Sequence, residues 1–442
     1  MSVTRNIRAL VVAYYFPPMG LSGVQRTAKL VKYLPDEGVD VTVLTVRPGG
    51  YFAFDQALLG EVQREGVTII RTPSADPTQL FGRERQVALP PEGGRRPVAA
   101  ASQFLLQPDN KIGWLPFAVR AGRRILAQVE HDLIFATAPP YTGLMVAERL
   151  AGHSGLPLVT DFRDDWVGNP RHTYPTAFHY RMAERQEARV LDRSARIHVI
   201  NDHIAAAIVA RKPSVASRIH VVPQGFDPAD FPRGSTSESD SRSGSGSGSG
   251  SVSGDTCTFL YTGVFYDAQR PDTFLKAFAA AGEQDHAFRR HARARFVGLV
   301  PAHMAALVTS LSLDESVSVT GYLSHPETVR EQQQADILWL TVGNRVGAEG
   351  ISTGKLYEYL GARTPILGLV PDGVARQTLA GSGMATCMDP DSVEEASRAM
   401  LNLFHAWKRG DKALPDEGWL STFDRRQQAC RIAQIFRTLT GT

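Results

Sequence analysis

The sequence predicts an α/β protein made of two Rossmann-like domains joined by a flexible linker. Its 442 residues are too many for a single hydrophobic core. Apolar strands alternate with amphipathic helical stretches in both halves, which is the pattern of open parallel sheets. Between the halves, residues 234–254 are almost wholly serine and glycine, a composition that behaves as flexible chain.

The predicted domain boundaries follow from that serine- and glycine-rich stretch. We expect an N-terminal domain at residues 1–233, a linker at 234–255 and a C-terminal domain at 256–420. The last segment, residues 421–442, has the spacing of an amphipathic helix that could pack back on the N-terminal domain.

Composition and charge narrow the class of protein. The chain is 43% hydrophobic and 21% charged, as is usual for a soluble globular protein. Residues 1–233 carry 28 basic against 22 acidic side chains, an excess too mild to indicate nucleic-acid binding. The three cysteines stand far apart without disulfide or metal spacing, which favours a reduced cytoplasmic protein (Cys257, Cys387 and Cys430). No apolar run is long enough to span a bilayer, and the N-terminus lacks a signal-peptide core.

The first half opens like a Rossmann-like unit. Residues 7–16 form a near-continuous apolar strand, followed by a glycine-bearing loop and a helix that starts near Ser22. Gly23 lies where the backbone could approach a ligand closely. No G-x-G-x-x-G motif follows, so a dinucleotide site is not predicted. Further strands are expected at 40–46, 132–136, 156–160, 197–200 and 219–222, with helices near 116–129, 142–152, 178–194 and 201–211 and a long surface excursion at 73–113.

An acidic cluster with one arginine follows the predicted strand 156–160. It reads Asp161-Phe-Arg-Asp-Asp-Trp166. Because the carboxyl ends of parallel strands line the ligand crevice, Arg163 and Asp164 are candidates for chemistry. The alternative is a salt-bridged loop in which Trp166 covers the core.

The second half repeats the strand–helix rhythm. Strands are expected at 258–263, 293–298, 317–320, 336–341 and 364–368. Helices are expected near 271–281, between the strands 293–298 and 317–320, after Ser324, at 355–362, at 391–407 and at 422–438. One Asp-x-Asp occurs, Asp389-Pro-Asp391, but its proline and the helix after it indicate a cap loop and not a metal site.

The most informative stretch, residues 349–367, joins two buried strands through one short helix. Thr353 and Gly354 stand at the predicted helix start, and Lys355 is in its first turn. Unpaired N–H groups, the positive end of the helix dipole and a lysine together predict a phosphate site. Glu358, one turn further, could accept a hydrogen bond from a sugar hydroxyl. The alternative is an ordinary capped helix with a surface lysine and glutamate.

Six short motifs, in the family's order, resemble the bacterial family-four glycosyltransferases of GT-B fold. That fold has two Rossmann-like domains facing each other across a cleft. The matching motifs are Tyr15-Phe-Pro-Pro with Gly23-Val-Gln-Arg26, Phe135-Ala-Thr-Ala-Pro-Pro140, Thr160-Asp-Phe-Arg-Asp-Asp-Trp166, Val222-Pro-Gln-Gly-Phe-Asp227, Tyr261-Thr-Gly-Val-Phe-Tyr266 with Arg270, and Thr353-Gly-Lys-Leu-Tyr-Glu-Tyr-Leu360.

The resemblance implies transfer of a sugar, with retention, from a nucleotide-diphosphate sugar bound by the C-terminal domain. Such an enzyme would need no metal ion and no cofactor beyond the donor. Arg270 and Lys355 would meet the diphosphate, and Glu358 the ribose, with Gly23, Gly263, Thr353 and Gly354 completing the donor site. Val264 stands where the family usually has an arginine, and Glu349 is one residue out of register with a second family glutamate. Arg163 or Asp164 occupies the place where some relatives have a histidine near the reacting carbon, and the sequence does not choose between them.

The resemblance also suggests an acceptor and a location. Such enzymes often extend lipid-linked or surface-polysaccharide acceptors, so we expect a cytoplasmic protein in peripheral contact with the inner face of an anionic membrane. An arginine-rich region beside Phe104, Leu105 and Leu106 could provide that contact (Arg83, Arg85, Arg95, Arg96, Arg120, Arg123 and Arg124). Two alternative functions are those of a GT-B-like nucleotide-sugar epimerase and of a non-enzymatic nucleotide- or glycan-binding protein.

Overall fold

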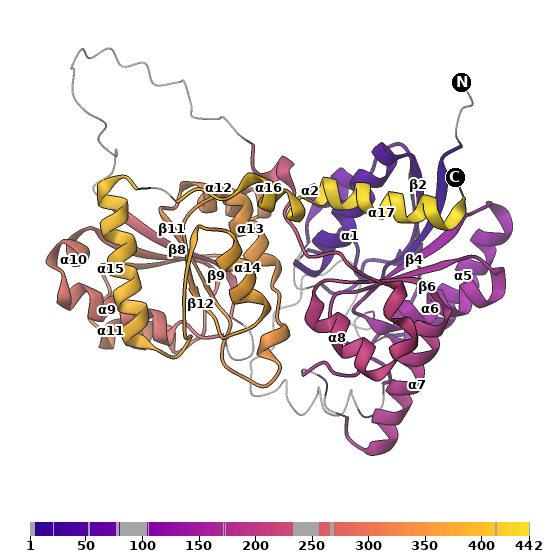
Figure 1. The fold of residues 1–442 in the computed structure, drawn as a ribbon, viewed down its shortest axis with the longest axis horizontal. Coiled ribbons are helices and arrows are strands. Elements are labelled where there is room, and N and C mark those ends of the chain that lie inside the picture. Colours follow the sequence, from indigo (N-terminus) through magenta and orange to yellow (C-terminus); the bar gives the residue numbers. More distant parts are fainter. Residues whose placement is uncertain are drawn as a thin grey trace, which may run out of the picture. The chain divides into compact units, whose positions relative to one another are not determined.

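The chain forms two compact units, each built on one parallel β-sheet (Figure 1). The computed structural model describes residues 5–20, 22–51, 54–76, 79, 104, 106–170, 172, 174–232, 256–265, 269–411 and 413–441. The first unit comprises Met1–Gln224 and Arg425–Thr442, and the second Gly225–Asp424. Two Rossmann-like units confirm the predicted fold class. The predicted linker, residues 234–255, lies outside the described residues.

The first unit has a seven-stranded sheet in the order β3-β2-β1-β4-β5-β6-β7. In this order, β1 pairs in parallel with both β2 and β4, so the direction of winding reverses between β1 and β4. The strands are β1 (Ile7–Val12), β2 (Val39–Val46), β3 (Val67–Thr72), β4 (Leu133–Ala138), β5 (Leu158–Phe162), β6 (Ser194–Val199) and β7 (Ile219–Val221).

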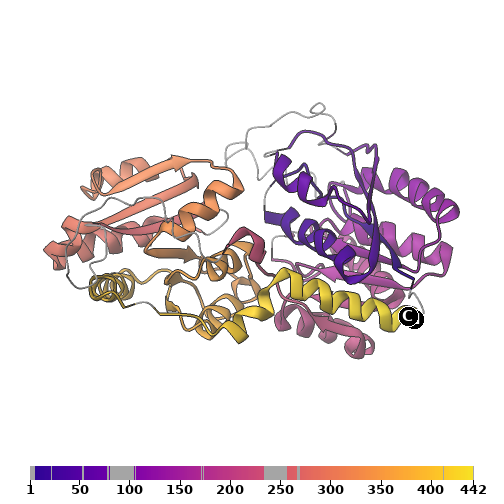
Figure 2. The same cartoon turned by 90° about the horizontal axis from the view of Figure 1, so that it is seen from above.

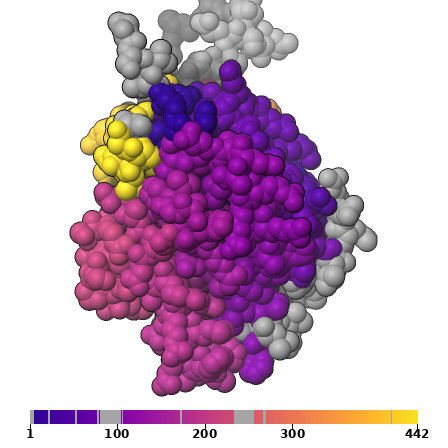
Figure 3. Space-filling view, turned by 90° about the vertical axis from the view of Figure 1, so that its right-hand side faces the viewer, coloured from indigo at the N-terminus to yellow at the C-terminus, as the bar shows by residue number. Residues whose placement is uncertain are grey.

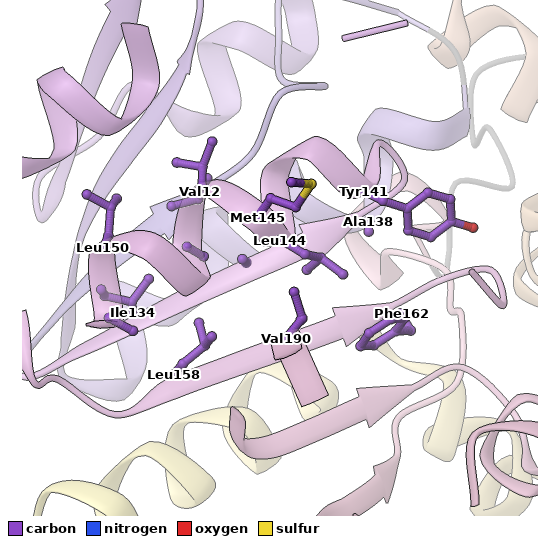
Figure 4. Packing of buried hydrophobic residues seen from close by; sticks show 14 of the residues in the cluster. Val12, Ile134, Ala138, Tyr141, Leu144, Met145, Leu150, Leu158, Phe162 and Val190 are labelled. Atoms are coloured by element: carbon purple, nitrogen blue, oxygen red, sulfur yellow. The ribbon is translucent and has the colours of Figure 1, made fainter. Parts of the chain in front are cut away.

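Helices cover both faces of this sheet because its central strands are apolar on both sides. On one face the strands pack against α5, α6 and α7; Figure 4 shows Ile134 and Leu158 of the sheet gathered with Leu144 and Val190 of the helices. On the other face they pack against α1. The helices are α1 (Ser22–Tyr33), α2 (Gln56–Val62), α5 (Leu115–Gln128), α6 (Tyr141–Ser154), α7 (Ala177–Arg193) and α8 (Asp202–Arg211).

The last helix of the chain, α17 (Arg425–Thr440), belongs to the first unit. It lies beside α1, as Figures 1 and 2 show, and is visible at the surface of this unit in Figure 3. Its buried face includes Ala429, Ile432 and Phe436, and the Phe436 ring centroid is 5.9 Å from that of Phe135 on β4. The C-terminal helix therefore completes the core of the N-terminal unit.

The second unit has a six-stranded sheet in the order β10-β9-β8-β11-β12-β13, with its reversal between β8 and β11. Its strands are β8 (Cys257–Val264), β9 (Ala292–Leu299), β10 (Val317–Gly321), β11 (Ile337–Thr341), β12 (Ile366–Leu369) and β13 (Ala385–Met388). Its helices are α9 (Asp272–Gln284), α10 (His286–His291), α11 (Met304–Ser310), α12 (His325–Gln334), α13 (Gly354–Ala362), α14 (Val374–Gly381), α15 (Val393–Arg409) and α16 (Glu417–Leu420). Phe226 and Phe231 pack against Gly361 of α13, which places residues 225–232 in this unit.

Two predicted helix starts are confirmed in detail. Asn201 accepts a hydrogen bond from the Ile204 N–H at the start of α8. Ser324 and Glu327 form a reciprocal capping box at the start of α12.

Several predicted strand bounds differ from the observed ones. The strand expected at 197–200 is β6, which begins at Ser194, and the strands expected at 7–16 and 156–160 also have other bounds. The strand predicted at residues 7–16 ends at Val12, although Ala13 and Phe16 remain buried before Pro17 and Pro18. The strand predicted at 156–160 is β5, which begins after Pro157 and runs to Phe162. Proline has no N–H to donate to a ladder, so pairing in β5 starts at Leu158, after Pro157 and two residues later than predicted. Asp161 therefore lies inside a strand. The elements α2, β3, α10, α14, β13 and α16 were not predicted.

The predicted surface excursion at residues 73–113 has buried ends. Asp76 is fully buried, with its carboxylate 3.6 Å from the Lys111 ammonium and 2.6 Å from the Tyr14 hydroxyl. Lys111 is also buried, so these two ends were wrongly placed on the surface. Most of the intervening residues lie outside the described part of the chain.

Candidate functional site

The switch point of the second sheet brings Gly263 and Lys355 together. Gly263 lies at the end of β8, and Lys355 is the second residue of α13, which follows the neighbouring strand β11. A Cβ atom at Gly263 would stand 3.1 Å from Lys355 Cε and 3.2 Å from its Nζ, and Gly263 has a φ of 115° that favours glycine. Ligands of open α/β sheets bind outside the carboxyl ends of the strands at such a switch point. These two predicted residues thus share the expected position.

The Lys355 ammonium rests on an aromatic ring. Its Nζ lies 3.7 Å from the ring centroid of Tyr261 on β8, a cation–π contact. The Tyr261 ring is itself stacked on Phe265, with centroids 4.1 Å apart. Burial lowers the pKa of Lys355 to about 7, while the nearby Glu358 carboxylate acts in the opposite direction. Among the described residues, Lys355 makes no hydrogen bond or ion pair, so its charge is not committed to a carboxylate there.

The start of α13 presents further polar groups beside this lysine. Thr353 is the N-cap residue, yet its side chain makes no capping hydrogen bond. Its Oγ1 is buried and has no hydrogen-bond partner among the described residues. The first N–H groups of a helix lack intrahelical acceptors, and the dipole is positive at this end. The predicted helix start at Thr353, Gly354 and Lys355 is therefore present, with donors that suit an anion.

Glu358 lies one turn further along α13 and contacts a histidine that the sequence did not assign to the site. The Glu358 Oε1 is 3.4 Å from Nε2 of His325, the first residue of α12. Both side chains are about one-fifth exposed. Sequence reasoning placed His325 at the start of a helix, and only the packing of α12 beside α13 reveals this contact.

The other two donor candidates lie in exposed segments. Arg270 is exposed, directly before α9, and makes no hydrogen bond or ion pair to any described residue. Glu349 is exposed in a short 3-10 helix, Ala348–Gly350. Its backbone lies against Gly373, where a Cβ would approach the Glu349 carbonyl oxygen to 2.4 Å. No described contact brings Arg270 or Glu349 to Lys355.

In the first unit, Arg163 lies at the switch point between β1 and β4. Its Nε donates a 3.2 Å hydrogen bond to the Ala138 carbonyl at the end of β4. One Nη donates to the Pro139 carbonyl, and the other to the carbonyl of Gly23 in the first turn of α1. Only 6% of Arg163 is exposed. The structure thus places the predicted residues Gly23 and Arg163 in direct contact.

Of the other acidic residues in the Asp161–Trp166 cluster, Asp161 and Asp165 form ion pairs, and Asp164 lies just after β5. Asp161 accepts 2.7 and 3.0 Å hydrogen bonds from the buried Arg26 guanidinium. Burial alone would raise the pKa of Asp161, but Arg26 and Thr137 hold it below its ordinary value. Asp165 pairs with Arg211. Asp164 is half-buried at the end of β5, and Trp166 is buried and stacked on Tyr141, so part of the predicted salt-bridged alternative is present as well.

Solved structures of similar fold were found over nearly the whole chain. Sucrose-phosphate synthase from Thermosynechococcus elongatus has 15% identity and a TM-score of 0.63, covering 99% of this chain and 100% of that one. HepE of Anabaena, in complex with UDP and glucose, has 13% identity and a TM-score of 0.61, covering 98% and 100%. WaaG, a glycosyltransferase involved in lipopolysaccharide biosynthesis, has 15% identity and a TM-score of 0.59, covering 97% and 99%. Among the curated proteins, none matches.

The sequence of the first unit decides the class. Residues 22–225 match the glycosyl transferase 4-like domain family. The chain is a GT-B glycosyltransferase. In this glycosyltransferase the matched region runs from α1 to the end of the first unit's β-sheet, and so includes Gly23, Arg163 and Asp164.

Two further features of the glycosyltransferase bear on metal and membrane. Within the described ranges, no three His, Cys, Asp or Glu side chains are arranged to hold a metal ion. Asp389 and Asp391 both accept hydrogen bonds from the Asn344 amide, and Ser392 after them caps α15, as the cap-loop prediction requires. Across the same ranges, no helix combines the length and the apolar character that crossing a bilayer requires.

Proposed function

We propose that this glycosyltransferase takes its sugar from a nucleoside-diphosphate sugar whose diphosphate is held by the second unit at Lys355. The observation that carries the proposal is the position of Lys355 Nζ, at the switch point, beside Gly263 and at the start of α13. A lysine, a helix start and the unpartnered Thr353 hydroxyl together offer donors for phosphate oxygens. HepE, which shares the fold, was solved with UDP and with UDP-glucose, which supports a donor of this kind.

In the proposed reaction, the bond between the sugar carbon and the diphosphate oxygen breaks while an acceptor oxygen bonds to the same face of that carbon. The departing diphosphate gains negative charge, which Lys355 and the α13 dipole stabilise. Configuration is retained because the new bond forms on the face that the diphosphate leaves. A leaving-phosphate oxygen takes the acceptor proton. The proposal requires no metal and no cofactor, because the lysine and the helix start supply the positive charge. Arg270 would add a second cation to the diphosphate as the segment before α9 meets the donor.

Glu358 and Asp164 take the remaining roles in this proposal. The Glu358 carboxylate, already oriented by His325, would accept hydrogen bonds from a ribose hydroxyl. Glu349 would contact the transferred sugar from its exposed loop. Of the two residues that the sequence left open, Asp164 is the better candidate for the reacting centre, because all three guanidinium nitrogens of Arg163 already bind backbone carbonyls.

Replacement of Lys355 by alanine tests the proposal. One charge-assisted contact contributes about 1.5–3 kcal/mol, so Lys355→Ala should weaken UDP binding about tenfold or more in calorimetry. Lys276, an exposed lysine of α9, provides the matched control, and Lys276→Ala should leave the affinity unchanged. Equal UDP affinity in wild type and folded Lys355→Ala would reject the diphosphate assignment. Slow hydrolysis of UDP-, GDP- or TDP-sugars by the wild type would identify the donor base and sugar.

We further propose that the acceptor is presented at an anionic membrane by the first unit. Helices α5 and α7 both begin at the edge where the parallel strands end, since each returns to the start of the next strand. Each has an exposed phenylalanine in its first turn, Phe117 in α5 and Phe178 in α7. Exposed arginines follow each at helical spacing, and α6 lies between the two helices (Arg120 and Arg124 in α5; Arg181, Arg185 and Arg189 in α7). Apolar tips with basic flanks suit a lipid surface.

Vesicle binding tests the membrane contact. The protein should sediment with vesicles containing phosphatidylglycerol at low salt and be released at high salt. Replacing Arg120, Arg124, Arg181 and Arg185 together by serine should abolish sedimentation, since each basic residue adds up to about 1 kcal/mol near an anionic bilayer. The same number of serine replacements at exposed arginines of the second unit should not (Arg289, Arg290, Arg398 and Arg409). Wild-type protein that stays in the supernatant would point instead to a soluble acceptor. Five residues of the predicted arginine-rich region lie outside the described residues: Arg83, Arg85, Arg95, Arg96 and Leu105.

A further inference from the structure

We propose that Arg163 is a positioning residue that spans the switch-point crevice of the first sheet and fixes the start of α1 against the turn between β4 and α6. The effect on turnover rests on the proposed function. The effect on hydrogen exchange does not, because it reports on the structure alone.

The contacts of Arg163 reach both sides of the crevice. On one side its guanidinium donates to the carbonyl of Gly23, the second residue of α1, which follows β1. On the other side it donates to the carbonyls of Ala138 and Pro139, which end β4 and precede α6. Arg163 itself follows β5. One side chain thus connects the segments after three strands, of which β1 and β4 flank the reversal of strand order.

A second buried contact makes this connection specific to the start of α1. Asp161, two residues before Arg163, holds the Arg26 guanidinium one turn further along the same helix. Arg26 also donates to the carbonyls of Val222 and Pro223 beyond β7, at 3.0 and 2.7 Å. The first turns of α1 are therefore attached at two points, at Gly23 by the arginine that follows β5 and at Asp161 of β5 by an arginine of α1.

The geometry separates Arg163 from the reacting atoms. Its nitrogens point to carbonyls and only 6% of the residue is exposed, so a bound sugar would meet other groups. The N–H groups at the start of α1 have no intrahelical acceptors and lie at the ligand edge of the sheet. Loss of the guanidinium would allow α1 and the β4–α6 turn to move apart. A shift of about 1 Å in the groups that position a substrate can lower the catalytic rate about a hundredfold.

Hydrogen exchange on the full-length chain tests the proposal directly. In Arg163→Gln, amides at the start of α1 and in the 138–144 segment should exchange about tenfold faster or more, because hydrogen bonds to a charged donor are lost there. Exchange in the second unit should not change. Arg193→Gln is the matched control: Arg193 also donates to a carbonyl of this unit, that of Ala151, but at the far end of α6. It should leave the exchange of both segments unaltered.

Turnover and binding measurements complete the test. With UDP-glucose as the probe, Arg163→Gln should lose at least about tenfold in kcat, while the Kd for UDP stays at the wild-type value because the second unit holds the nucleotide. Arg163→Lys should recover part of both losses, since one ammonium cannot reach three carbonyls in the guanidinium geometry.

Each contrary result overturns the proposal in a distinct way. Lost turnover with unchanged exchange would mean that Arg163 contacts the substrate directly. Faster exchange with normal turnover would mean that the start of α1 is not part of the site. Wild-type exchange and turnover in Arg163→Lys would reject the three-carbonyl clamp, and this variant decides if Arg163→Gln does not fold. Wild-type protein that binds none of UDP, GDP and TDP would reject the proposed donor site, while leaving the exchange result to stand.

Discussion

The surroundings of Lys355 change its protonation equilibrium. A lysine in water is charged at any physiological pH, but here the ammonium rests on the Tyr261 ring in a partly buried place. Burial brings its pKa to about 7, against the pull of Glu358. Glu358 in turn contacts His325 of α12. At neutral pH a substantial fraction of Lys355 is therefore uncharged before any ligand arrives.

We predict that UDP binding takes up a proton and weakens as the pH rises from 7 to 9. A bound diphosphate favours the charged lysine, so the pKa of Lys355 rises in the complex. Below pH 6 Lys355 of the free protein is already charged. Above pH 7 much of it is neutral, so binding must take up a proton. Affinity should then fall by up to about tenfold per pH unit. Calorimetry in two buffers of different ionisation enthalpy measures the proton uptake.

Arginine at this position is the control for that prediction. Lys355→Arg is always charged and should remove both the proton uptake and most of the pH dependence between 7 and 9. If wild type and Lys355→Arg share the same pH profile, the titrating group is not Lys355.

At the scale of elements, α17 shows how a helix distant in sequence becomes part of the first unit. Its spacing predicted an amphipathic helix, and its apolar face enters the core beside β1 and β4. We predict that Phe436→Ala lowers the free energy of unfolding of the first unit by about 3–5 kcal/mol, because it leaves a cavity against Phe135. Gln434→Ala, at an exposed position of the same helix, should change it by less than about 0.5 kcal/mol. Urea unfolding compares the two, and equal midpoints would show that α17 contributes little to this core.

For the whole molecule, the two units differ in how the chain builds them. The second unit is one continuous segment, Gly225–Asp424, which contains Gly263, Lys355 and Glu358. The first is discontinuous, because it needs Arg425–Thr442. We predict that residues 225–424 alone fold and bind UDP with a Kd within about threefold of that of the full chain. A threefold change in Kd is smaller than the loss of one charged contact would cause, so this result would mean that no such contact comes from the first unit. Residues 1–224 alone should be unstable and recover when 425–442 is supplied as a peptide.

Circular dichroism and calorimetry on these fragments measure the outcome. A folded 225–424 fragment that does not bind UDP would show that the first unit contributes essential donor contacts. A 1–224 fragment as stable alone as with the peptide would contradict the assignment of α17 to its core.

The sequence by itself determined the two α/β units, most of their elements and the helix start at Lys355. These features are local: apolar runs bounded by proline and glycine predict parallel strands, and Ser324 with Glu327 or Asn201 alone specifies a helix start. The late start of β5 has a local cause as well, since Pro157 has no N–H for the ladder and pairing begins after it.

Only the tertiary structure decided what each candidate side chain does. Strand order brings β8 beside β11, and this places Tyr261 under Lys355; it brings β1 beside β4, and this directs Arg163 to the carbonyls of Gly23 and Pro139. In sequence, Arg163 and Asp164 were equivalent candidates. Their surroundings differ because Arg163 is buried against three backbone carbonyls, whereas Asp164 is only half-buried. Periodicity along a chain specifies which face a residue takes, but the partner on that face comes from crossover connections that join distant segments.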